Sequence, residues 1–205
     1  MTPDNQAKNS TRDRIIDATA SLIPELGWGG VTSRRVADRA GVKPGVLHYH
    51  VASMDELLRL AAVRRIRRFF KDRVDGLLIL DDPGDAIEEL FHGLVSVDPQ
   101  NPDFQLLAES LVAANRDQEL RVELADSLAE LRRTLIDWFR ARRVASPGPL
   151  AVTVVAAIDG FLLQRMLDPD LDPAPLVEAL RALASHVSPW EETHLNSPSS
   201  RELLG

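Results

Sequence analysis

Residues 31–58, VTSRRVADRAGVKPGVLHYHVASMDELL, predict two short helices, a tight turn and the start of a third helix. Thr32 is a good N-cap for the first helix, because its side-chain oxygen can accept a hydrogen bond from the free amides of the opening turn. Gly41 stands where a left-handed residue would end that helix, and Pro44 fixes φ in the first turn of the next one. Two short helices joined by a glycine turn are typical of a helix-turn-helix.

This stretch resembles the DNA-binding head of the tetracycline-repressor (TetR) family of bacterial transcription regulators. The residues at matching positions are Thr32, Val36, Ala37, Ala40, Gly41, Val42, Gly45, Leu47, His50, Ser53 and Leu57. Three positions depart from the family pattern. Lys43 replaces the usual serine cap, His48 replaces a tyrosine that touches phosphate, and Met54 replaces a lysine at the start of the following helix.

The resemblance implies that helix 43–50 lies in the major groove of DNA and that residues on and beside it make the contacts. By the same matching, Thr32, Tyr49 and His50 hold phosphates, and Arg34 and Arg35 reach a phosphate or a base edge. The residues implied to lie close to the bases are Lys43, Pro44, Gly45 and His48.

The charge distribution of the chain fits this expectation although its net charge is −7. Residues 1–75 hold 14 Lys and Arg against 9 Asp and Glu, whereas residues 76–205 hold 10 against 22. A basic head on an acidic body suits a DNA-binding protein, because the local field decides the interaction. The basic side of helix 53–75, with Arg64, Arg68 and Lys71, is more consistent with a solvated face than with a DNA contact.

Composition limits the remaining function classes. The chain has 205 residues, of which 44% are hydrophobic, and it has no cysteine, which excludes disulfides and thiol chemistry. The polar N-terminus has no apolar signal core, and no apolar run approaches the length needed to span a bilayer, so we expect a cytoplasmic protein. His48 and His50 lie two residues apart on a helix and point in different directions, so we expect no metal site. The sequence shows no nucleophile–base–acid set and no nucleotide loop, so we also expect no catalytic residues and no cofactor.

Helical periodicity continues through the rest of the chain, and no strand pattern is present, so we predict an all-α fold of about nine to ten helices. A disordered arm over residues 1–9 precedes the first helix, which Ser10 or Thr11 caps. The later helices are predicted at about 53–75, 117–144, 150–167 and 175–187. Between the first two of these, one helix carries the apolar residues from Ile87 to Val95 and another those from Phe104 to Val112. We divide the chain into a DNA-binding head (10–55), a ligand-binding and dimerisation body (56–187) and a disordered tail (188–205).

The body supplies candidate residues for a ligand pocket and for a dimer interface. The inward aromatic and aliphatic residues predicted to wall a pocket are Phe70, Phe91, Phe104, Leu107, Trp138 and Phe161. The resemblance implies that the last two long helices pair in a four-helix dimer interface, for which we select Leu128, Leu131, Leu135, Val154, Ile158 and Phe161. Asp159, inside an apolar helix, is more consistent with a satisfied structural carboxylate than with a ligand contact.

We therefore expect a homodimeric repressor that binds an inverted-repeat operator in double-stranded DNA and is released by a small-molecule effector. Two alternatives stay open. One is a DNA-binding regulator without a small-molecule effector, controlled by a protein partner or by its own concentration. The other is an all-α enzyme with an appended head, for which the sequence contains no recognisable catalytic set. The sequence does not identify the ligand, the operator or the regulated genes.

Overall fold

A computed structural model describes residues 3–98 and 100–185. Over these residues the chain forms nine α-helices, one short 3-10 helix and no strand, which confirms the predicted all-α fold. The elements are α1 (Pro3–Leu26), η1 (Trp28–Gly30), α2 (Ser33–Ala40), α3 (Pro44–His50), α4 (Met54–Leu78), α5 (Pro83–Val95), α6 (Pro102–Ala114), α7 (Gln118–Ala141), α8 (Pro147–Arg165) and α9 (Ala174–Ser185).

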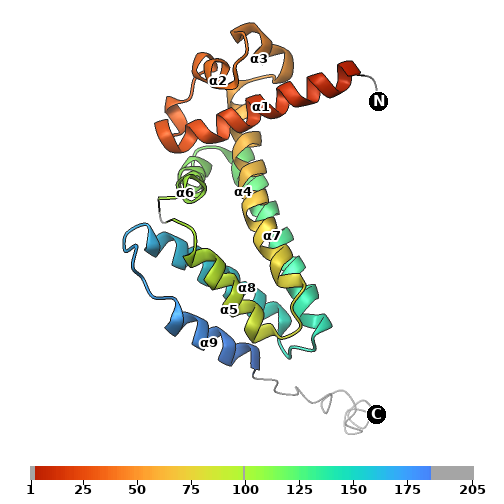
Figure 1. The fold of residues 1–205 in the computed structure, drawn as a ribbon, viewed down its shortest axis with the longest axis vertical. Coiled ribbons are helices and arrows are strands. Elements are labelled where there is room, and N and C mark those ends of the chain that lie inside the picture. The colour runs from red at the N-terminus through yellow and green to blue at the C-terminus, as the bar shows by residue number, and fades with distance from the viewer. Residues whose placement is uncertain (1–2, 99, 186–205) are drawn as a thin grey trace, which may run out of the picture.

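The molecule is elongated, with a small helical head at one end and a layered body at the other (Figure 1). Helices α1, α2 and α3 form the head, whereas α5, α8 and α9 lie together at the far end. Helices α4 and α7 run lengthwise and side by side, and α6 lies beside α4 just below the head. Helix α4 is therefore a single rod that reaches from the head into the body.

Two hydrophobic cores correspond to these two ends. The head core joins the buried faces of α1, α2 and α3 to the first half of α4, and it receives Leu106 from α6. The body core joins the second half of α4 to α5 through α9 and contains most of the buried aromatic residues. Helix α4 contributes to both cores, with Leu57 and Ile66 in the first and Phe69 and Leu77 in the second.

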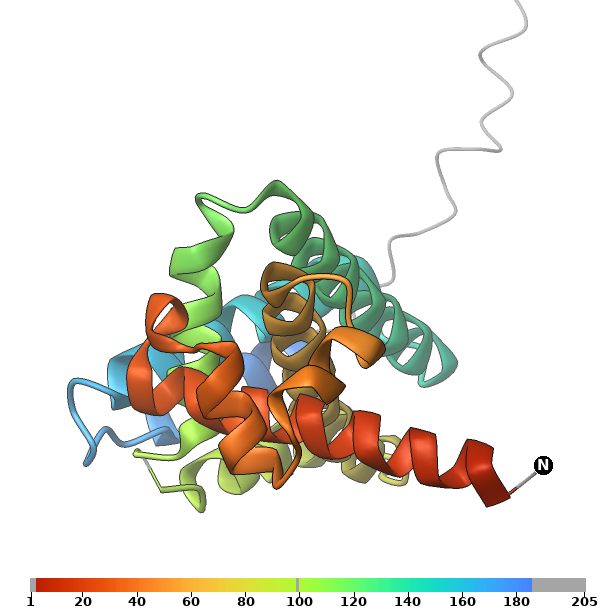
Figure 2. The ribbon, with the colours of Figure 1, turned by 90° about the horizontal axis from the view of Figure 1, so that it is seen from above.

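The N-terminal helix begins earlier than predicted. Residues 3–9 belong to α1, so the expected disordered arm over residues 1–9 was wrong for this segment. Pro3 suits the first helical turn, because a proline has no backbone N–H and the first turn offers no intrahelical partner for one. The N-terminal part of α1 projects beyond the other helices of the head (Figure 2). The predicted tail, 188–205, lies outside the described residues.

Helix α8 also begins earlier than predicted, at Pro147 instead of Leu150, because prolines are tolerated in a first turn. It has 19 residues and is long and apolar enough to cross a membrane by length and composition alone. The expectation that no apolar run approaches that length was therefore wrong. The core helices of soluble proteins share these properties, and Ala151, Val154 and Ile158 of α8 are buried in the body core.

Candidate nucleic-acid interface and ligand cavity

The helix-turn-helix forms as its sequence predicts. Thr32 has an extended backbone, and its Oγ1 accepts a hydrogen bond from the Arg35 amide at 3.4 Å. Gly41 adopts φ +65° and ψ +41°, the left-handed conformation that ends α2 without a Cβ clash. Pro44 occupies the first turn of α3, and Leu47 anchors that helix with only 1% of its surface exposed. The turn between α2 and α3 is therefore set by local residues.

Sequence reasoning missed one residue that holds this turn in place. Arg14 of α1 donates from Nε and Nη2 to the carbonyl oxygen of Ala40 at 3.2 and 2.9 Å, and from Nη2 to that of Gly41 at 3.2 Å. These carbonyls are at the C-terminal end of α2, where no intrahelical donor is available. The contact crosses 26 residues, so no local pattern indicated it.

The head is also tied together on its outer side. Arg39 of α2 forms a two-pronged ion pair with Glu25 of α1, with distances of 2.8 and 2.7 Å, and donates to Ser21 Oγ at 3.0 Å. The hydrogen bonds from Arg39 lower the pKa of the Glu25 carboxyl. The side chain of Arg39 therefore stabilises the packing of α2 against α1. It is not among the predicted DNA contacts.

Most of the predicted DNA contacts lie on the solvent side of α2 and α3. Those that are exposed are Thr32, Arg34, Arg35, Lys43, Pro44, Gly45 and Tyr49, and His50 is half-buried. Tyr49 is 68% exposed, and its ring meets that of His50 edge-on at 5.3 Å between centroids. Arg35 also donates to the Gly30 carbonyl at 2.7 Å. The side chain of His48 lies outside the described part of the chain.

The body contains a cavity of about 780 Å³, here called the body cavity, between α4, α6 and α7 with one residue from α8. Its apolar lining residues are Ile66, Phe70, Val74, Leu107, Leu111, Ala114, Leu124, Ala125, Leu128 and Leu131. Its polar and charged lining residues are Arg64, Arg67, Arg68, Lys71, Asp75, Arg121, Ser127, Glu130, Thr134 and Asp159. A cavity of this size and character is typical of a site for a drug-sized ligand.

Only two of the six predicted pocket residues, Phe70 and Leu107, line the body cavity. The other four lie in the body core, with at most 7% of their surface exposed: Phe91, Phe104, Trp138 and Phe161. Periodicity shows which side of a helix is apolar. It does not show whether that side meets close-packed neighbours or an open space.

The dimer-interface prediction needs a larger correction. Four of its residues, Leu135, Val154, Ile158 and Phe161, have at most 3% of their surface exposed and are buried in the chain's own core. Leu128 and Leu131 line the body cavity. None of the six is an exposed side chain that a second chain would cover. The exposed apolar residues of this region are Val152 and Leu163 of α8, Leu167 just after it, and Leu183 of α9.

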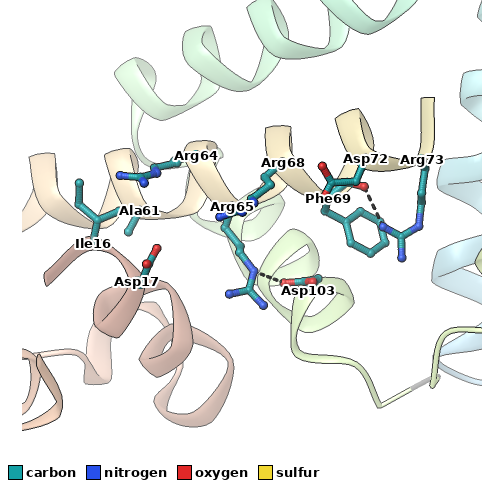
Figure 3. A pocket seen from close by; sticks show the side chains of 10 residues that line it. All are labelled: Ile16, Asp17, Ala61, Arg64, Arg65, Arg68, Phe69, Asp72, Arg73 and Asp103. Carbon is teal, nitrogen blue, oxygen red and sulfur yellow. Dashed lines mark hydrogen bonds and ion pairs between the residues drawn. The ribbon is translucent and has the colours of Figure 1, made fainter. Parts of the chain in front are cut away.

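A second, smaller space of about 400 Å³ lies where α1, α4 and α6 meet, and Figure 3 shows its lining residues. Arg65 of α4 pairs with Asp103 of α6 at 2.6 Å across it. Arg73 donates to the Phe69 carbonyl at 2.8 Å, its guanidinium carbon is 3.5 Å from the centre of the Phe69 ring, and burial lowers its pKa. This cleft is polar, and the Arg65–Asp103 ion pair joins α4 to α6 across it, so we regard it as part of the joint between head and body.

Further contacts cross this joint. The Trp28 amide, in the head, donates to Glu109 Oε2 of α6 at 3.3 Å. Arg59 of α4 pairs with Asp117 at 3.3 Å and with Glu119 at 2.5 Å, at the start of α7. The head thus contacts α6 directly, and it is connected to α7 through α4. Within the described residues, no group of three or more metal-ligating side chains is present.

Comparison with known proteins gives matches over both parts of the chain. Residues 15–61 match the family model described as bacterial regulatory proteins, tetR family, and residues 80–187 match the model described as tetracyclin repressor-like, C-terminal domain. The HTH-type transcriptional regulator PksA of Bacillus subtilis is 24% identical over 175 residues, which cover 85% of this chain and 77% of PksA.

Two solved structures are similar to this one over most of the chain. A TetR-family member from Streptomyces coelicolor, SCO1917, has a TM-score of 0.70 and 28% identity, and the alignment covers 85% of this chain and 98% of that one. The multidrug binding protein EbrR, solved in complex with imidazole, has a TM-score of 0.66 and 26% identity, with coverage of 87% and 97%.

Proposed function

The chain belongs to the TetR family of DNA-binding transcriptional regulators, and from this premise we propose that it is a homodimeric repressor that a small-molecule ligand releases from its operator. The family is one of regulators and not of enzymes. We place the protein in the cytoplasm, where such regulators meet DNA.

The exposed face of the helix-turn-helix carries the DNA-binding part of this proposal. Lys43, Pro44 and Gly45 begin α3 on its solvent side, so that this end of the helix can approach base edges in a major groove. Thr32, Tyr49 and His50 flank it and are proposed to hold phosphates, while Arg34 and Arg35 reach a phosphate or a base. His48 completes the proposed set.

Binding to a duplex selected from a random library tests this assignment. If about six phosphates are neutralised, log K should fall with log salt with a slope of about −5. Tyr49→Ala should weaken binding to all sequences alike, whereas Lys43→Ala should change the preferred sequence. Arg133→Ala removes one positive charge, as Lys43→Ala does, from an exposed site on α7 and serves as the control. A binding constant that does not respond to salt would contradict the assignment.

The exposed apolar residues of α8 and α9 support a dimer. Helix α8 is apolar nearly all round, yet Val152, Leu163 and Leu167 point away from the core, with Leu167 90% exposed. A helix that is hydrophobic on all sides is normally buried on all sides. We propose that a second copy covers this face in a twofold arrangement, and that the two heads read half-sites about 34–36 Å apart.

Light scattering on the full chain tests the dimer. Leu163→Glu combined with Leu167→Glu should yield a folded monomer with weak DNA binding, because a single head makes too few contacts. Ile79→Glu places one such carboxylate on another highly exposed apolar residue, 82% exposed at the end of α4, and should leave the dimer intact. A double variant that stays dimeric would place the interface elsewhere.

The body cavity supports control by a ligand because its walls belong to helices that also build the head. Phe70 and Val74 of α4 line the cavity, while Leu57 and Ile66 of the same helix pack in the head core. On α6, Leu107 lines the cavity, Leu106 packs in the head core and Glu109 accepts from the Trp28 amide. A ligand that prefers one setting of these helices changes the spacing of the two heads. EbrR, whose structure is similar, binds multiple drugs.

The proposed control of DNA binding by a ligand can be tested because the two binding equilibria must be thermodynamically linked. A ligand found by its effect on thermal stability should bind more weakly in calorimetry when operator is present, and by the same factor that it weakens DNA binding. A coupling of about 1–3 kcal/mol, equivalent to roughly 5–150-fold, is sufficient for regulation. Equal ligand affinities with and without operator would show that this ligand does not control DNA binding.

A further inference from the structure

Asp159 is the acidic group most withdrawn from solvent among the residues that line the body cavity. It lies on α8, between Ile158 and Gly160, on a helix whose neighbouring side chains fill the body core. It lines the cavity together with Leu128, Leu131 and Thr134 of α7. Within the described residues, its carboxylate makes no hydrogen bond and no ion pair. The expectation of a satisfied structural carboxylate was therefore wrong.

The surroundings compensate the charge of this carboxylate only in part. Arg132 of α7 is close enough to act on it through its charge, yet it forms no ion pair with it. Burial is the largest influence on Asp159 and raises the pKa of its carboxyl. A partly buried carboxylate without a partner is costly, so a complementary group supplied from outside would be bound favourably.

The other charged groups around the cavity are either paired or solvated. Arg64 pairs with Asp13 at 2.5 Å, and Lys71 pairs with Asp75 at 2.5 Å. Arg67 donates to Ser127 Oγ at 2.7 Å and is itself exposed. The remaining three, Arg68, Arg121 and Glu130, are exposed. Exposed charges attract a ligand weakly because water and salt screen them.

We propose that the body cavity binds a lipophilic organic cation, whose positive group lies against the Asp159 carboxylate while its apolar groups lie against α4, α6 and α7. This inference rests on the proposed function, because it names the chemical class of the effector. Ten aliphatic or aromatic residues line the cavity, so the ligand must be largely apolar. Its volume of about 780 Å³ lies within the range of about 300–1,000 Å³ that drug-sized ligands occupy.

Two probe ions of nearly equal shape and opposite charge separate the role of charge from that of size. Tetraphenylphosphonium is a cation, and tetraphenylborate is an anion with the same arrangement of four phenyl rings. In calorimetric titrations of the full chain, we expect the cation to bind at least about tenfold more tightly, the ratio that one contact between opposite charges provides. An equal or tighter affinity for the anion would overturn the proposal and would assign the cavity to acidic ligands held by its arginines.

A pair of variants locates the effect at Asp159. Asp159→Asn should weaken tetraphenylphosphonium binding at least about tenfold, without weakening that of tetraphenylborate. Asp126→Asn removes the same charge from an exposed position on α7 outside the cavity lining and should change neither affinity. Circular dichroism establishes that both variants are folded, and the comparison of the two ions on the unaltered protein needs no variant. An Asp159→Asn protein that keeps its full affinity for the cation would also overturn the proposal.

These titrations contain no DNA, so their result is independent of the head. If the cation does not bind but operator binding and its salt dependence are as expected, the ligand class proposed here fails and the regulator remains. If the cation binds but operator does not, the proposed function fails and the cation site remains.

Discussion

Side chains satisfy helix ends in both regions, but among the described residues the buried side-chain nitrogen atoms that lack a hydrogen bond all lie in the body and none in the head. Arg14 donates to the last carbonyls of α2, and Thr32 and Ser53 cap α2 and α4. Among the described residues, the buried side-chain nitrogens without a hydrogen bond are Arg73 Nε, Arg132 Nε, Trp138 Nε1 and Arg165 Nε, and all lie in the body. Fully satisfied polar groups hold a structure in one arrangement, while unsatisfied ones leave room for another. We infer that the head is built to keep its shape and the body to accept a change.

The largest expected difference between the two regions is in the free energy of unfolding that is lost when a leucine is shortened to alanine. Leu47 is 1% exposed in the head core, and Leu47→Ala should lower the free energy of unfolding by about 3 kcal/mol. Leu107 is half-buried and borders the body cavity, so Leu107→Ala should cost about 1 kcal/mol. Urea denaturation followed by circular dichroism measures both. Equal losses would mean that the cavity wall is as tightly packed as the head core.

A second comparison concerns two glycines of the head itself. Gly41→Ala should cost about 1–2 kcal/mol, because φ is +65° at this position. Gly45 is helical and a Cβ there would meet no atom within 4 Å, so Gly45→Ala should stabilise the free protein by about 0.5 kcal/mol. The same methyl group should weaken operator binding if this residue approaches the bases. Thermal melts and fluorescence anisotropy separate the two effects, and a Gly45→Ala protein that binds DNA normally would remove this residue from the interface.

A third prediction concerns Asp159 and pH. Burial raises the pKa of this carboxyl above its ordinary value of 3.8. Such a group costs nothing below the unfolded pKa, and it destabilises the protein as pH rises through the folded pKa, because the unfolded chain ionises more easily. Asp159→Asn should therefore match the unaltered protein in acid and exceed it near neutral pH by no more than about 1 kcal/mol, since solvent on the open side of the cavity screens the charge. This corresponds to about 2–4 °C in Tm, and a difference independent of pH would contradict it.

The smallest effect tests the joint between the two regions. Glu109→Ala removes the acceptor of the Trp28 amide and should cost only about 0.5 kcal/mol of global stability, because the hydrogen bond is 3.3 Å long and partly solvated. Hydrogen exchange at the Trp28 amide should nevertheless become faster, and the ligand should shift operator affinity by a smaller factor. Glu109→Gln keeps an acceptor oxygen and is the matched control. Unchanged exchange in the alanine variant would show that α6 does not hold the head.

The turn and the helix boundaries of the helix-turn-helix could be predicted because they depend on local chemistry, whereas the start of α1 and the long-range contact of Arg14 could not. Gly41, Pro44 and Ser53 each have one conformational role, and that role depends on the residue type and its immediate neighbours. The body could not be predicted in the same way. Phe91 and Phe161 repeat at helical spacing just as Phe70 does, and only tertiary packing decides which of them borders an open space. Asp159 was visible in the sequence, but its lack of a partner depends on the packing of several helices at once.

The rod formed by α4 has a consequence for recombination between relatives. Leu57, Leu58 and Ile66 belong to the head core, although they follow the predicted boundary at residue 55, and Leu106 enters that core from α6. A fragment that ends at residue 55 would lack these side chains and would leave the apolar surface of the head core exposed to water. We therefore expect that this head can be fused to the body of a relative only when the junction lies beyond Ile66. The body of that relative must also supply an apolar side chain of similar size in place of Leu106. A transfer of DNA-sequence specificity between such proteins must therefore include the first half of α4, the helix that also connects the head to the ligand-binding body.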